Sequence, residues 1–427
     1  MSELQRTAIF CAVAAVLVAS ATIVDPGQVT PEIFDDQGEA FFPDFTDPQA
    51  PKMIEILDYD AATATTRPLK VEFKDGKWSI PSHHSYPADA EERLAKTAAA
   101  LIELRKDMII SDRVEDEGEY GVIDPLGERA SSLAGRGKRV TLRDENGDAL
   151  VDFVVGRKTP GKPGYRYMRV PSQKRIYAVK TDADVSAKFE DWIETDLLKL
   201  SITDIRKVAI NSYSINERIG RLENLEKVTL TKTKDKWRMS GGGTPNTDKM
   251  SDLAAALDDL RIVDVQPKPA NLTQDLKTAK GITLSMQSVA SLRQKGFFMV
   301  RTGQLFSNEG EILVETANGL RYTLRFGEIA SGGPSASAGE AGGSEPSPPD
   351  SKANQQQERR YVFITVDHSA ARAKKYADGK EPDDKGKDLA RELRNRFADW
   401  YYVISGADVP PEMPRRRWWQ RGRSASS

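Results

Sequence analysis

One pattern occurs twice in this chain at a constant offset, and this repetition limits the folds that the chain can adopt. A Lys-Trp pair is followed by a loop, an Asp and an Ala/Leu-rich segment, and the whole pattern returns 159 residues later without a gap. The repeated positions are Trp78 and Trp237, Asp89 and Asp248, and Leu101 and Leu260. We therefore expect an internal duplication that gives two similar lobes.

Each copy carries the signals of a strand followed by a helix. After Asp89 and Asp248, apolar residues recur at helical spacing. An Asp, Asn or Thr before such a spacing is a start signal for a helix. The pattern therefore predicts amphipathic helices over residues 89–105 and 248–261.

Two Asn-Gly pairs each separate two apolar runs, which is the pattern of a β-hairpin. The pairs lie at residues 146–147 and 318–319. Asn-Gly favours a type I′ turn, in which both central residues have positive φ. Gly156 and Gly327 follow the second run of each pair, and we expect each to end a strand.

A third match indicates that the second copy is longer than the first. Phe189–Trp192 matches Phe397–Trp400 at an offset of 208. Most of the 49 extra residues fit in residues 330–359, a Gly/Ser/Pro-rich stretch that we expect to be a disordered insertion because it has almost no large apolar side chain. The remainder fits a charged loop at 374–387.

Four tryptophans thus occupy matched places in the two copies: Trp78, Trp237, Trp192 and Trp400. We interpret them as structural repeat anchors packed in the core, because two active sites would seldom be built on the same aromatic residues. The alternative is an aromatic platform for a ligand in each lobe, which would require exposed rings in a concave surface.

The motifs of the chain predict no catalytic, cofactor-binding or metal site. The three histidines, His83, His84 and His368, are too few for a multi-histidine metal centre, and the adjacent pair aligns with glycines in residues 241–243. Those glycines lack the Gly-Lys-Ser/Thr of a phosphate loop, and no Gly-x-Ser-x-Gly elbow occurs. Residues 144–155 resemble a calcium loop but lack its central Gly and its final acid.

Length and charge restrict the classes of function. A chain of 427 residues is long enough for two or three domains. Its 62 basic and 64 acidic residues are nearly balanced, so a nucleic-acid partner is not expected.

The N-terminus predicts the location of the protein. Residues 8–24 form an apolar run behind Arg6, and as a helix they would span about 25 Å, close to the thickness of a membrane core of about 30 Å. We expect residues 1–25 to be an uncleaved transmembrane anchor with its N-terminus in the cytoplasm. Alternatives are a cleaved signal peptide, since residues 19–21 have a small-x-small form, or a buried helix. The run also contains the single cysteine, Cys11, so the remainder has no disulfide.

The rest of the chain divides into four segments. Residues 26–51 are expected to be an extended tether with solvated acids, 52–203 the first α+β repeat and 204–409 the second. Residues 410–427 are rich in Arg and Trp, and this tail would either bind anionic lipid or a partner, or be disordered. The expected fold class is α+β, with two similar lobes that each contain a curled antiparallel sheet and one main amphipathic helix.

The first copy also carries a set of short motifs that are moderately specific together. They are Asp75–Trp78, Pro87–Asp89, Tyr120–Pro125, a strand ending at Gly156, Tyr167–Val170 and Trp192. With these motifs the chain resembles the bacterial domain-of-unknown-function family 4340 (DUF4340), well over residues 68–200 and loosely over the second copy, which lacks the Tyr-Gly and Asp-Pro segment. The resemblance implies a membrane-anchored envelope protein, often encoded near transport-permease components of the gliding-motility type. It implies no activity and no catalytic residue.

The predicted function is therefore binding rather than catalysis. We expect a single-pass protein of the cell inner membrane, with most of its chain in the periplasm, that serves as a binding or scaffold subunit of a transporter-like complex. No cofactor is expected, and the pattern indicates no particular small-molecule ligand. An alternative is an exported hydrolase with a carboxylate pair in the cleft between the lobes. A third possibility is a purely structural spacer.

Overall fold

A computed structural model describes residues 36–405 of the chain. The description leaves out residues 62–63, 128–133, 182, 184, 195, 217–220, 234–235, 242–244, 259, 279–280, 282–284, 301–302, 331–358 and 378–384. The predicted transmembrane anchor with Cys11, most of the predicted insertion and the Arg/Trp tail lie outside the described residues. Among the described residues, no helix is both long and apolar enough to cross a membrane.

The described residues form an α+β fold with antiparallel sheets and seven α-helices. The first lobe, residues 36–200, is built on a sheet in the order β4-β3-β2-β1-β6-β7-β8-β9-β5. Its strands are β1 (Met53–Asp60), β2 (Thr65–Lys74), β3 (Lys77–Ile80), β4 (Tyr86–Pro87), β5 (Met108–Ser111), β6 (Lys138–Arg143), β7 (Ala149–Lys158), β8 (Tyr165–Arg169) and β9 (Ile176–Lys180). Its helices are α2 (Glu91–Ile102) and α3 (Glu117–Tyr120), with 3-10 turns η1 (Pro81–His83), η2 (Val114–Asp116) and η3 (Phe189–Trp192).

The second lobe, residues 201–405, has a sheet in the order β12-β11-β10-β16-β17-β18-β19-β13. Its strands are β10 (Ile205–Asn216), β11 (Arg221–Thr233), β12 (Lys236–Met239), β13 (Ile262–Pro267), β16 (Glu311–Thr316), β17 (Leu320–Ile329), β18 (Arg359–His368) and β19 (Trp400–Ser405). A separate pair, β14 (Phe297–Met299) and β15 (Leu305–Ser307), lies outside this sheet. The helices are α4 (Thr247–Asp258), α5 (Ala270–Thr278), α6 (Met286–Gln294), α8 (Ala370–Tyr376) and α9 (Lys385–Ala398), and η4 is Ile202–Asp204.

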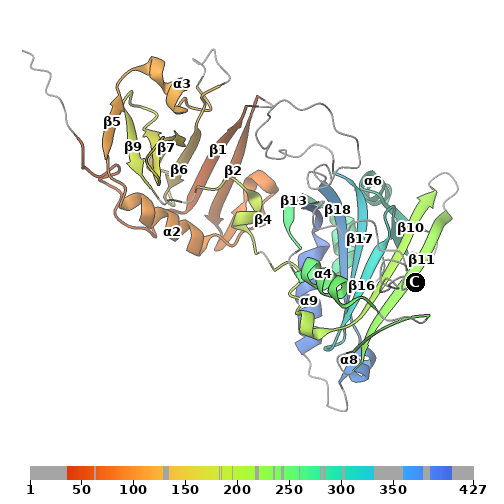
Figure 1. The fold of residues 1–427 in the computed structure, drawn as a ribbon. Helices are drawn as coiled ribbons and strands as arrows, with labels where there is room; N and C mark the ends of the chain where they lie inside the picture. Colours follow the sequence, from red (N-terminus) through yellow and green to blue (C-terminus); the bar gives the residue numbers. More distant parts are fainter. Residues whose placement is uncertain are drawn as a thin grey trace, which may run out of the picture.

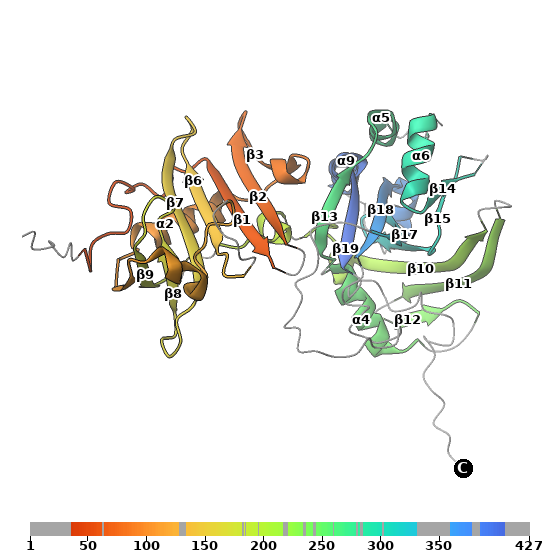
Figure 2. The same cartoon turned by 90° about the horizontal axis from the view of Figure 1, so that it is seen from above.

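The strands of the two sheets are connected in the same order (Figures 1 and 2). In each lobe the first three strands run outward from the centre, and a helix follows, α2 or α4. The next strand, β5 or β13, lies at the opposite edge. The chain then returns to pair with the first strand and proceeds back to that edge as a meander. Within the described part of the two main sheets, only β4 lacks a counterpart, and the separate β14–β15 pair has none in the first lobe. β1 begins at Met53 and β10 at Ile205, near the expected starts of the repeats at residues 52 and 204.

The predicted helices and hairpins are confirmed. α2 begins two residues after its predicted start and α4 one residue before, and both end three residues earlier than predicted. Each turns an apolar face inward, with Leu94 and Leu101 on α2 and Leu253 and Leu257 on α4. The hairpins form between β6 and β7 and between β16 and β17.

The predicted type I′ turn is wrong in both hairpins. Gly147 and Gly319 have positive φ, of 89° and 82°, whereas neither preceding Asn does. A backbone hydrogen bond runs from the amide of Gly147 to the carbonyl of Asp144, so the Gly closes the turn instead of occupying its centre. The longer loop explains the difference, because loops of this length are commonly built with a single left-handed residue.

The predicted tether is wrong for residues 36–51, which pack against the first lobe. Phe41 and Phe45 are buried, and the ring of Phe42 lies 5.6 Å from that of Phe153 on β7. The carboxylate of Asp36 is bound by three side chains, so it is not solvated as we expected. Phe41 and Phe45 explain the docking, because burial of each ring stabilises the contact by about 1.5–3 kcal/mol, and the partly buried Phe42 adds to it.

Corresponding surfaces of the two sheets are covered by different parts of the chain. In the first lobe, α2 and residues 36–45 pack on the core face. In the second, α4 is joined by α9, whose Leu393 and Phe397 are buried against the sheet. On the opposite face, α3 lies against the first sheet, whereas α5, α6 and the β14–β15 pair cover the second.

The predicted match of Phe189–Trp192 with Phe397–Trp400 does not extend to the strand order. Trp192 ends η3, which follows β9, the last strand of the first lobe in chain order. Trp400 begins β19, which has the place of β9 in the second sheet. In chain order, the first Asp-Trp pair therefore follows strand β9, whereas the second pair stands at the start of the equivalent strand β19.

Candidate functional site

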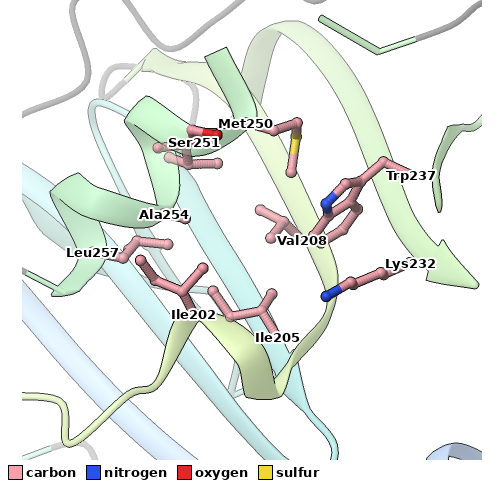
Figure 3. A pocket seen from close by; sticks show the side chains of 10 residues that line it. Ile202, Ile205, Val208, Lys232, Trp237, Met250, Ser251, Ala254 and Leu257 are labelled. Carbon is pink, nitrogen blue, oxygen red and sulfur yellow. The ribbon is translucent and has the colours of Figure 1, made fainter. Parts of the chain in front are cut away.

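An apolar pocket of about 100 Å³ lies between α4 and the strands β10, β11 and β12 of the second lobe (Figure 3). Most of its wall is aliphatic or aromatic, and Lys232 and Ser251 supply its polar side chains. The lining residues are Ile202, Ile205, Val208, Lys232, Trp237, Met250, Ser251, Leu253, Ala254 and Leu257.

The local sequence explains how these side chains converge. Met250, Leu253 and Leu257 recur at spacings of three and four, so they share one face of α4. Trp237 is the second residue of β12 and stands opposite Lys232 of β11 in the antiparallel register. Ile202 of η4 is 44% exposed, which places an aliphatic side chain at the pocket mouth.

The corresponding place in the first lobe is filled differently. Phe73 pairs with Trp78 there, as Lys232 pairs with Trp237, and the two rings are 5.2 Å apart. The amine of Lys52 lies 5.7 Å from the ring of Phe73. An aromatic side chain in the first lobe thus stands where the second lobe has a lysine beside the pocket.

The size of the pocket limits what it can bind. Ligand pockets commonly measure about 300 to 1,000 Å³, and this one is about 100 Å³. That volume suits one aliphatic or aromatic side chain rather than a whole cofactor. Side chains that insert into such pockets carry much of the binding energy of protein interfaces.

A second candidate is a charged cluster on the outer face of the first lobe. Arg139 contacts Asp124 and Asp152 at 2.9 and 2.7 Å, and Arg169 lies 3.4 Å from Glu117. Burial raises the pKa of Glu117, which Arg169 opposes and Asp124 reinforces. The guanidinium of Arg169 donates to the carbonyls of Val122, Pro171 and Gln173.

This cluster stabilises the loop that carries the Tyr120–Pro125 motif. Arg169 is buried and binds both an acid and several carbonyls, which is what a buried cation needs to offset its desolvation. The acid whose pKa is raised therefore lies beside an arginine on the outer face of the first lobe. The alternative hydrolase would require such an acid in the cleft between the lobes, and Glu117 does not lie there.

The histidine pair has a packing role that the sequence did not indicate. His83 stacks on Phe189 with ring centroids 4.6 Å apart, and its Nδ1 lies 3.1 Å from the hydroxyl of Ser82. Burial lowers the pKa of His83, against the attraction of Asp264 in the second lobe. Among the residues that the structure describes, no three His, Cys, Asp or Glu side chains gather as metal ligands.

The four predicted tryptophan anchors lie in or against the main core. Trp192 is fully buried, and Trp78, Trp237 and Trp400 are half-buried and pack against the same cluster. Trp237 alone also lines the pocket. Trp400 meets the ring of Tyr86 at 5.2 Å, which is a contact between the two lobes.

Sequence reasoning missed a buried lysine in the second lobe. The ammonium of Lys268 donates to the carbonyl of Phe397 at 2.7 Å and to that of Trp400, so it ties the end of α9 to the start of β19. It also lies 4.3 Å from the centre of the Phe363 ring and 5.2 Å from that of Tyr401. Pro267 and Pro269 on either side of Lys268 mark the segment as irregular, but they gave no sign of burial.

We expect Lys268 to make stability depend on pH. Burial lowers its pKa to about 7, against the opposing attraction of Asp399. The pKa of a lysine in an unfolded chain is about 10.4, so between these two pKa values the unfolded chain binds more protons than the folded one. The free energy of unfolding should therefore rise with pH in this window, by about 2 kcal/mol from pH 7 to pH 9.

Urea unfolding at pH 7 and pH 9 tests this expectation. Lys268→Met should lack the rise, although it also leaves two carbonyls without their donor and lowers stability at both values. Lys96→Met, which removes an exposed lysine on α2, should keep the rise. Equal pH dependence in Lys268→Met and in the unmodified protein would contradict the assignment.

Comparison with known proteins gives one match. The family model described as Domain of unknown function (DUF4340) matches residues 78–277, which confirms the resemblance. The match runs from β3 of the first lobe to α5 of the second and thus includes α4 and all the residues that line the pocket. No curated protein and no solved structure matches the chain.

Proposed function

We propose that this chain, whose residues 78–277 belong to the DUF4340 family, is a membrane-anchored binding or scaffold protein on the extracytoplasmic side of a bacterial inner membrane. It would serve as an accessory subunit of a transporter-like envelope complex and display two lobes to it. The apolar run at residues 8–24 supports the anchor. The family resemblance supports the association with transport components.

We further propose that the two lobes arose by duplication. The constant offset of 159 residues between the Lys-Trp segments supports this, as does the shared strand order of the two sheets. The copies then diverged at the pocket, where Phe73 corresponds to Lys232. A duplicated scaffold with one altered surface is the arrangement expected when one copy has acquired a binding role.

The size and lining of the α4 pocket carry the proposal. A pocket of about 100 Å³ with a half-exposed Ile202 at its mouth suits the insertion of an apolar side chain from a protein partner. Trp237 provides a rigid wall, and aromatic residues are enriched where interfaces derive most of their binding energy.

Filling the pocket should weaken partner capture. We expect Ala254→Phe to reduce the recovery of permease subunits after crosslinking in cells by about tenfold or more, because it blocks an anchor site worth at least about 1.4 kcal/mol. The measurement is mass spectrometry of crosslinked partners after membrane extraction.

A matched control separates binding from folding. Ala95 occupies the equivalent place on α2, 159 residues earlier, so Ala95→Phe should leave capture unchanged if the second lobe binds. Ile202→Ser alters the mouth without filling the pocket and should also reduce capture. If all three variants fold, as judged by circular dichroism, and capture partners equally well, the pocket is not the contact site.

A further inference from the structure

The chain enters the folded body through a docked segment at one edge of the first sheet. The carboxylate of Asp36 accepts hydrogen bonds from Lys106 at 2.7 Å, from Tyr177 at 2.5 Å and from Arg175 at 3.1 Å. Burial raises the pKa of Asp36, but these three hydrogen bonds outweigh it and lower the pKa to about 2. The carboxylate is therefore charged at any ordinary pH.

Backbone bonds continue this contact beyond Asp36. The amide of Gly38 donates to the carbonyl of Lys106, the amide of Lys106 donates to Glu39, and the amide of Phe41 donates to Leu104, at 2.8, 3.0 and 2.8 Å. Residues 36–41 thus run antiparallel to the segment that follows α2. With Phe41 buried, the segment forms a strap across the lobe.

The strap lies at the opposite edge of the first sheet from the second lobe. Arg175 immediately precedes β9, and Tyr177 lies within it, next to the edge strand β5. The second lobe meets the other side, where Tyr86 of β4 contacts Trp400. Figure 1 shows β5 and β9 at the end of the first lobe that is remote from the second.

We infer that the β9–β5 edge of the first lobe faces the membrane and that the second lobe, with its α4 pocket, is held at the distal end. This inference rests on the proposed anchor in residues 8–24. The 11 residues from Asp25 to Asp35 can span at most about 40 Å in any conformation. The strap fixes the edge at which this short link begins.

The exposed charges on this edge are of both signs, including Arg113 and Lys174 but also Asp112 and Glu115. Bulk attraction to anionic lipid would be weak for such a surface. The covalent link, rather than surface charge, should therefore set the orientation. Orientation should then be the same on neutral and anionic bilayers and at low and high salt.

Energy transfer to the bilayer tests the orientation. The full-length protein, carrying Cys11→Ser, would be inserted into phosphatidylcholine vesicles containing an acceptor-labelled lipid. A donor dye would be placed by Lys174→Cys beside β9, by Lys77→Cys on β3 or by Asp252→Cys on α4, which are all exposed positions. We expect transfer to be strongest from residue 174, weaker from 77 and weakest from 252.

A substitution of Asp36 tests whether docking of the strap sets the orientation. Asp36→Asn should keep the protein on the vesicles but reduce transfer from residue 174, because the neutral amide loses its charged contacts. Asp44→Asn, which removes an exposed acid of the same segment, should change nothing. Unchanged transfer in Asp36→Asn would overturn the role of the carboxylate.

The outcomes distinguish this inference from the proposed anchor. If the protein does not float with the vesicles at all, the anchored function fails. If it floats but transfer is equal from the three sites, or strongest from residue 252, the anchor stands and the orientation is wrong. A strong dependence of transfer on anionic lipid would also overturn the inference, because surface charge would then set the orientation.

Discussion

Replacing Gly327 by Ala is expected to destabilise the protein by about 3 kcal/mol or more. A Cβ at this position of β17 would lie 2.1 Å from the carbonyl oxygen of Lys295 and 2.8 Å from the ring of Phe297. The nearest atom belongs to the backbone, so no side-chain rotation relieves the overlap. The layer formed by α6 and β14 would have to separate from the sheet. Urea unfolding monitored by circular dichroism measures the loss.

The first lobe should respond in the same way at Gly156. Its Cβ would meet the carbonyl oxygen of Tyr120 at 2.3 Å, so the α3 segment approaches β7 as α6 approaches β17. Gly161→Ala is the control, because nothing lies within 4 Å and only its φ of +70° opposes a side chain. That strain costs about 1–2 kcal/mol. If Gly327→Ala or Gly156→Ala costs no more than this control, close backbone approach is not the reason for glycine.

These two glycines show how far the sequence could predict the fold. The pattern predicted that each ends the second strand of a hairpin. The hairpins are present, but β7 and β17 continue two residues beyond Gly156 and Gly327. The pattern did not reveal that both accept the backbone of a covering layer. The Tyr120-Gly121 pair and Lys295-Gly296 occupy equivalent positions against the two sheets, although only their glycines agree. A contact made by backbone atoms places little restriction on the side chains of the contacting residues, so the sequence does not predict it.

The candidate site was less predictable than the fold. Trp237 was identified by the repeat, but the pocket beside it depends on Ile202 of η4 and on α4 side chains that also follow the ordinary pattern of a core helix. Lys268 and Asp36 were missed for a related reason. Their partners lie more than 100 and about 70 or more residues away, and local pattern carries no information about such pairs.

The strongest effect among the tryptophans is expected at Trp192. Its side chain is fully buried, its indole nitrogen donates to the carbonyl of Ser186 at 2.9 Å, and its own carbonyl accepts from the amide of Asp89. The guanidinium of Arg93 lies 5.2 Å from the ring. Trp192→Ala removes the indole hydrogen bond and the contact with Arg93 and leaves a large cavity, while the backbone bond from Asp89 can remain, so we expect a loss of about 3–5 kcal/mol.

Trp400→Ala should cost less, about 1–2 kcal/mol, because its ring is half-buried and makes its aromatic contact with Tyr86 across the lobes. Chemical denaturation of the two variants measures the difference. Part of the Trp400 loss should disappear when Tyr86→Ala is already present, since the two rings share one contact. Equal losses at Trp192 and Trp400 would support the original equivalence of the two Asp-Trp segments and contradict the strand order. A larger loss at Trp192 would agree with its full burial in η3 after β9, whereas Trp400 is half-buried at the start of β19, and would mean that the two matched tryptophans do not have equivalent places in the core.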